Sequence, residues 1–112
     1  MADRKRMPPR RASETFGFTH SAPGRQGVNY TVTIGFYDLD MTKPGEVFLN
    51  AEKLTTDLDI AARDSAILLS YAIQHGADPA SIALSMARDE EGRPLGVMGT
   101  LLDLMIKEQA GK

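Results

Sequence analysis

The chain of 112 residues contains no cysteine and no tryptophan, and His20 and His75 are its only histidines. Without cysteine it forms no disulfide, carries no catalytic thiol and offers no thiolate to zinc or to an iron–sulfur cluster. A metal site usually needs three or four converging ligands, so two histidines are too few to indicate one. The sequence therefore predicts no metal, no cofactor and no catalytic residue, and we expect a protein that is not an enzyme.

Aromatic residues are also scarce, at 6% of the chain, and no apolar run approaches the roughly 20 residues that cross a bilayer. Hydrophobic residues nevertheless make up 42% of the sequence, which predicts a core of aliphatic side chains. The N-terminus is charged but is not followed by the apolar segment of a secretory signal. We expect one cytoplasmic domain with no membrane segment.

Positive charge is concentrated at the start of the chain, although the net charge is −2. The first eleven residues contain one acid, Asp3, and five cations, which are Arg4, Lys5, Arg6, Arg10 and Arg11. Pro8 and Pro9, and the lack of any apolar period, argue against a helix or a strand there. We interpret residues 1–12 as a disordered basic arm. It is either a solvated end that docks weakly on its own domain or a segment that neutralises nucleic-acid phosphates.

Three strands are predicted between residues 13 and 50. Residues 13–19 alternate apolar and polar side chains, and residues 29–38 do so most clearly. A third strand is predicted over 46–50, after a turn whose tight point we place at Pro44–Gly45. The apolar side chains of the second strand share one face, so we expect an antiparallel sheet with one face to be covered. They are Tyr30, Val32, Ile34 and Phe36.

One long helix over residues 55–76 is predicted to provide this cover. Thr56 or Asp57 is suited to cap its start, and Gly76 to end it. Its polar residues form a thin line, Asp59, Arg63, Ser70 and Gln74, and the rest is almost entirely apolar. Such a helix is expected to be buried on more than one side. We therefore predict a twofold homodimer, with interaction residues Leu58, Ala62, Leu69 and Ile73.

Two shorter helices complete the predicted domain. Asp78 and Pro79 open a helix over 78–88, and an apolar stripe predicts another over about 96–109. The fold class is therefore α+β: a small antiparallel three-stranded sheet packed on one long helix plus two shorter helices. Residues 13–112 form this single domain.

The run from Tyr30 to Ile82 resembles the TSCPD domain, a small accessory domain of ribonucleotide reductases that also occurs as a free-standing short protein. The similar segments are YTVTIGF (30–36), GEVFLN (45–50) and AARDSAILLSYAIQHGADPASI (61–82). RPLGVMGTLLDLM (93–105) falls where the family has a Cys-Pro segment and its last helix. Here Arg93 precedes Pro94, so no role of the family's cysteines carries over.

The resemblance implies an accessory module associated with nucleotide reduction, because the domain is not the catalytic barrel of those enzymes. We therefore predict a non-enzymatic regulatory module that binds an unknown protein partner. The alternative is a nucleic-acid-binding protein, from a phage or mobile element, that uses the five cations of the arm.

Overall fold

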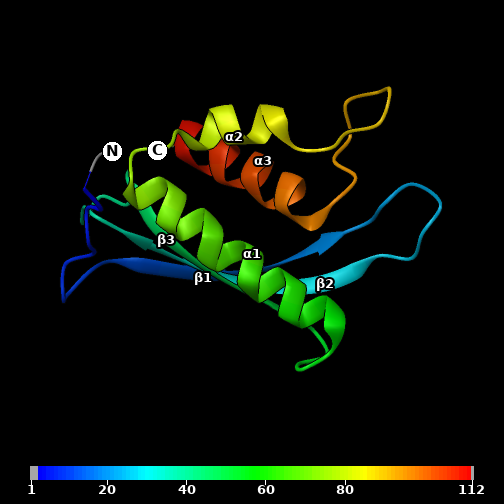
Figure 1. Cartoon of the computed structure of the whole chain (residues 1–112), viewed down its shortest axis with the longest axis horizontal. Coiled ribbons are helices and arrows are strands. Elements are labelled where there is room, and N and C mark those ends of the chain that lie inside the picture. Colours follow the sequence, from blue (N-terminus) through cyan, green and yellow to red (C-terminus); the bar gives the residue numbers. More distant parts are fainter. Residues whose placement is uncertain (1–2, 112) are drawn as a thin grey trace.

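The computed structural model describes residues 3–111 (Figure 1). Its elements are, in order, β1 (Ser13–His20), β2 (Val28–Phe36), β3 (Pro44–Ala51), α1 (Asp57–Gln74), α2 (Pro79–Ser85) and α3 (Val97–Ala110). The strands form one antiparallel sheet in the order β1-β2-β3. This confirms the predicted α+β class, with its three-stranded sheet, one long helix and two shorter helices.

The register of the sheet brings the apolar side chains of all three strands onto one face. Phe16 of β1 lies opposite Val32 of β2, which lies opposite Leu49 of β3. The predicted apolar face of β2 is buried. The other face carries mainly threonine and asparagine, and on it the hydroxyl groups of Thr15 and Thr33 are 2.7 Å apart.

The helices cover the apolar face of the sheet. Figure 1 shows α1 running diagonally across the sheet, with α2 and α3 beside it. α1 and α3 each contribute three buried side chains to the same aliphatic core: Ala62, Ala66 and Leu69 from α1, and Leu101, Leu102 and Met105 from α3. A small core of this kind needs helices on one face only, so the threonine face is left to solvent.

The predicted capping residues of α1 and α2 are confirmed, whereas α2 ends at Ser85 and not at the predicted residue 88. The Thr56 side chain accepts a hydrogen bond from the Asp59 N–H at 3.2 Å, as an N-cap does. Gly76 follows α1 with φ of 99°, a left-handed conformation that glycine adopts without strain. Asp78 caps α2 by accepting from the Ala80 N–H at 3.2 Å, and Pro79 is the first helical residue.

The turn between β2 and β3 differs from the prediction. Pro44 and Gly45 are the first residues of β3, so placing the tight point of the turn there was wrong. The Asp38 carboxylate closes the turn earlier, since it accepts from the N–H groups of Thr42 at 3.0 Å and Lys43 at 2.9 Å. An aspartate side chain that accepts from backbone N–H groups a few residues ahead favours a turn at its own position.

Residues 3–12 contain no helix or strand, but they lie against the domain along a defined path. The Ala12 carbonyl accepts from the Phe36 N–H at 2.9 Å, at the start of β1. Farther toward the N-terminus, the Lys5 N–H donates to the Gln74 carbonyl at 2.7 Å, at the end of α1. The arm therefore crosses one end of the sheet and reaches the last turn of α1, so in this structure it is docked.

Candidate interaction surfaces

Two polar side chains of α1 bind the backbone of β3, the strand at one edge of the sheet. The Ser70 Oγ accepts from the Val47 N–H at 2.8 Å and lies 3.1 Å from the Val47 carbonyl. The Gln74 side-chain amide donates to the Gly45 carbonyl at 2.8 Å. Edge strands present unpaired backbone groups, so these contacts cap the outer edge of β3.

Asp59 caps the other end of the same edge. Its fully buried carboxylate accepts from the Ala51 N–H at 2.8 Å and from the Thr55 N–H at 3.0 Å. The hydrogen bond from Thr55, together with those from Ala51 and Asn50, holds the pKa of this carboxyl below its usual value despite its burial. Thr55 has φ of 64°, and its bond to Asp59 helps to hold that conformation.

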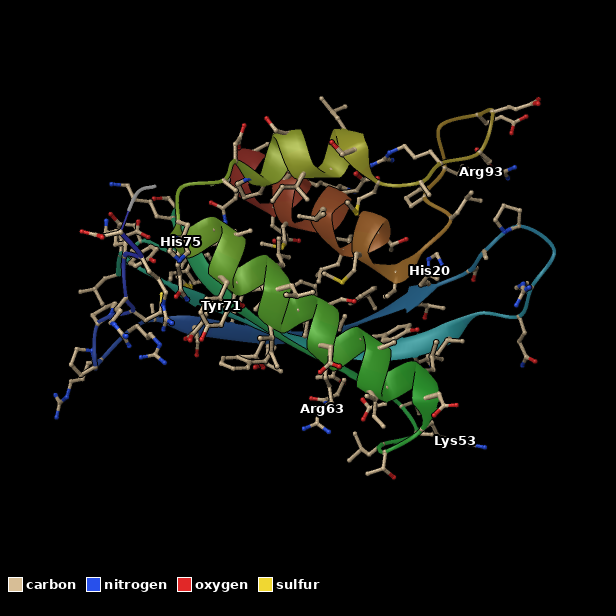
Figure 2. All side chains as sticks on the ribbon, viewed as in Figure 1. His20, Lys53, Arg63, Tyr71, His75 and Arg93 are labelled. Carbon is tan, nitrogen blue, oxygen red and sulfur yellow. The ribbon has the colours of Figure 1, made fainter. Side chains whose placement is uncertain are left out.

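The predicted polar line of α1 is thus directed mainly toward β3, and an apolar face of the helix is left exposed. Ile60, Ile67 and Tyr71 follow one another at helical spacing, and about half of each side chain is accessible. Beside them Leu68 is 71% exposed. Figure 2 shows Tyr71 and Arg63 on the side of α1 away from α2 and α3. We call Ile60, Ile67, Leu68 and Tyr71 the α1 face.

An apolar groove adjoins the α1 face where α1 meets the other two helices. Its volume is about 390 Å³, and Leu68 belongs to both surfaces. Two methionines line it, and methionine side chains adapt to differently shaped ligands. The groove is formed by Leu68 and Leu69 of α1 with Ile82, Met86, Met98 and Leu102.

The structure places the four predicted interaction residues differently. Ala62 and Leu69 are buried in the core of this chain, and Leu69 also lines the groove. Ile73 is partly buried, and Leu58 is about half exposed. The accessible surface of α1 is therefore on the opposite side of the helix from Ala62 and Leu69, and includes side chains that the sequence reasoning did not select.

Three of the five cations of the arm contact the domain. The Arg4 guanidinium lies 4.5 Å from the centroid of the Tyr71 ring, and the Lys5 ammonium lies 4.6 Å from that of Tyr37. Arg11 forms an ion pair with Glu46 of β3 and donates to the Pro8 carbonyl at 2.7 Å. Arg6 and Arg10 are exposed.

The two histidines have positions typical of structural residues. The Nδ1 of His20 lies 2.8 Å from the Thr100 Oγ1 and its Nε2 lies 3.2 Å from the Leu95 carbonyl, so it links β1 to the start of α3 (Figure 2). His75 is the C-cap residue of α1. Among residues 3–111, no three histidine or carboxylate side chains gather in a way that holds a metal ion.

A double hydrogen bond fixes the loop before α3. Arg88 donates to both carboxylate oxygens of Asp103, at 2.9 Å and 2.8 Å, and to the Gly92 carbonyl at 3.0 Å. The hydrogen bond from Arg88 holds the pKa of the Asp103 carboxyl below its usual value. The acidic loop at residues 89–93 is thereby attached to α3.

Comparisons of the chain with protein-family models, with curated proteins and with solved structures found no match. None of the helices within residues 3–111 is long and apolar enough to cross a membrane.

Proposed function

We propose that the chain is a non-enzymatic accessory module that binds a protein partner through the α1 face and the adjoining groove. The observation that carries the proposal is the orientation of α1: Ser70 and Gln74 bind β3, whereas Ile60, Ile67 and Leu68 are exposed. Contiguous exposed apolar patches on a small domain mark interaction sites more often than isolated exposed residues do.

The charges around the α1 face define the chemistry of the partner. Asp57 and Asp64 are exposed between Leu68 and the line of Ile60 and Tyr71, and the Arg63 side chain is 55% exposed on the other side of that line. This arrangement fits an amphipathic partner helix whose leucine-like side chains contact the α1 face, with a lysine or arginine opposite the two acids. The partner helix lies along α1 and inserts one side chain into the methionine-lined groove.

The resemblance to the TSCPD domain is our basis for proposing which protein this partner is. The similar segments correspond to β2, β3, α1 and the start of α2, which together form the α1 face and the edge that orients it. On this proposal the module is cytoplasmic and binds a ribonucleotide reductase, or a protein that regulates one. Its role is to dock, since the family's cysteines are absent.

Site-specific photo-cross-linking in cells tests the proposal. A benzoylphenylalanine at Leu68 should give one defined adduct with another protein, and Ile67→Glu in the same chain should reduce that adduct about tenfold. The matched control places the probe at Thr31 on the threonine face, where no adduct is expected. Equal labelling from both positions would remove the α1 face as the interface. An adduct that contains no reductase component would remove only the family link.

Nucleic-acid binding by the arm stays a prediction. Arg4, Lys5 and Arg11 contact the domain, which leaves Arg6 and Arg10 as the arm cations outside these contacts, and two phosphate contacts give weak, salt-sensitive affinity.

A further inference from the structure

The two edge strands of the sheet differ in whether their outward backbone groups have partners. The outer edge of β3 is capped by Asp59, Ser70 and Gln74 of α1. β1 forms the other edge and pairs only with β2. Because the Ala12 carbonyl accepts from the Phe36 N–H, the even-numbered residues of β1 bond to β2 and the odd-numbered ones point their backbone groups outward. Those residues, Ser13, Thr15, Gly17 and Thr19, are all exposed.

The sequence of this open edge is nearly symmetric about its centre. Residues 13–21 read SETFGFTHS, so Phe16 and Phe18, then Thr15 and Thr19, stand at equal distances from Gly17. At the ends of the symmetric stretch an acid, Glu14, corresponds to a base, His20. An antiparallel pair of identical strands centred on Gly17 therefore places each residue opposite its counterpart.

We propose that two copies of the chain pair β1 to β1 about a twofold axis at Gly17, which joins their sheets into one of six strands. The register agrees with the ladder inside each copy, because it pairs odd-numbered residues whose backbone groups point outward. Thr15, Gly17 and Thr19 of the two strands then exchange about six backbone hydrogen bonds.

The side chains of both faces fit this arrangement. On the core side, Phe16 and Phe18 are only partly buried in one copy, and each gains the other phenylalanine of the partner as its cross-strand neighbour. Glu14 lies opposite the partner's His20, and no like charges face each other within the paired strands. The basic arm leaves β1 toward Glu46 and Gln74, away from the open edge, so it does not occupy the position of the second copy.

Charge pairs at Thr15 and Thr19 test both the pairing and its register. In the proposed dimer residue 15 of each copy faces residue 19 of the other, so the contact occurs at two equivalent places. The variant Thr15→Lys/Thr19→Lys should therefore raise the dimer dissociation constant about tenfold, as measured by sedimentation equilibrium. Thr15→Lys/Thr19→Glu carries the same first change and should restore dimerisation to about the wild-type level. Within one chain these side chains are about 13 Å apart, so their mutual effect is small.

A single cysteine gives an independent readout, because the natural chain has none. Gly17→Cys places two identical thiols across the axis, where mild oxidation should yield a covalent dimer. Thr31→Cys, which is also exposed but lies on the central strand, should form no covalent dimer under the same conditions. The proposal is overturned by a wild-type chain that is monomeric near 1 mM, by equal dissociation constants for the two charge variants, or by equal cross-linking at both cysteines. The cross-linking test at Leu68 and Ile67 concerns the α1 face, which is separate from the β1 edge. Its result therefore does not affect the test of the dimer.

Discussion

The Ser70 Oγ of α1 accepts from the Val47 N–H at 2.8 Å, and it lies 3.1 Å from the Val47 carbonyl and 2.9 Å from the Ala66 carbonyl of its own helix. The serine of α1 thus accepts from the N–H that a fourth strand would otherwise bind. This relationship orients α1 about its own axis, and thereby decides which side chains of the helix meet solvent.

The first prediction concerns this serine. Ser70→Ala leaves the Val47 N–H without its partner in a partly buried position, and we expect a loss of about 1–3 kcal/mol in the free energy of unfolding. Urea denaturation of the full chain measures it. Ser65→Ala is the matched control, since the Ser65 hydroxyl binds only the Ala61 carbonyl of its own helix, and its effect should stay within about 0.5 kcal/mol.

Two adjacent leucines test the orientation of α1. Leu69 is 6% exposed and belongs to the core, whereas Leu68 is 71% exposed. Leu69→Ala should therefore lower the free energy of unfolding by about 2–4 kcal/mol. Leu68→Ala should change it by no more than about 0.5 kcal/mol. Similar losses for the two variants in the monomeric chain would contradict the orientation described above.

Asp59 predicts how stability changes at low pH. Its pKa is lowered in the folded state, first by the hydrogen bond from Thr55, so the ionised carboxylate stabilises the fold at pH values above its unfolded pKa of about 3.9. That contribution is lost as the pH falls through the lower, folded pKa. Asp59→Asn should thus be less stable than the wild type at pH 7, because an amide has only one acceptor oxygen for two N–H donors. The difference between the two chains should shrink below about pH 4, and a constant difference from pH 7 to pH 2 would contradict this reading.

A substitution at Gly45 tests how firmly the arm is bound to the domain. A Cβ at this position would collide with the Met7 sulfur and the Tyr37 ring. Gly45→Ala should therefore displace the arm and speed tryptic cleavage after Arg6 and Arg10, as followed by mass spectrometry. Gly96→Ala is the control, since a Cβ there meets no atom within 4 Å, and its cleavage rate should match the wild type.

The salt dependence of DNA binding tests the alternative function. If Arg4, Lys5 and Arg11 keep their contacts, only Arg6 and Arg10 meet phosphates, and the logarithm of the binding constant should fall with that of salt with a slope of about −2. An arm that undocks and uses all five cations would give about −4.5. Fluorescence anisotropy with a short labelled duplex measures the slope.

The elements themselves could be predicted from local patterns. The alternation in residues 29–36, the Asp78–Pro79 helix start and the left-handed Gly76 each depend on neighbours in sequence, and the structure has all three. The orientation of α1 depends instead on a strand edge that exists only after folding. A signal was present, because four polar residues on one line of a mainly apolar helix indicate that something polar lies opposite them.

The same reason explains the predicted interaction residues. Ala62 and Leu69 were selected for being apolar, but apolar character does not distinguish the side of a helix that meets its own sheet from the side left open. Likewise, the charges and prolines of the arm predict no regular structure, yet the arm is docked through rings and a carboxylate that are distant in sequence, Tyr37, Glu46 and Tyr71.

The capping of β3 by α1 limits how far strand addition can proceed. A sheet with two open edges can add strands from further molecules at both edges without limit, and such growth leads to fibrils. In the proposed dimer only the β1 edge accepts another strand, and the twofold pairing occupies that edge in both molecules. Ser70, Asp59 and Gln74 would then keep the assembly finite by closing the β3 edge.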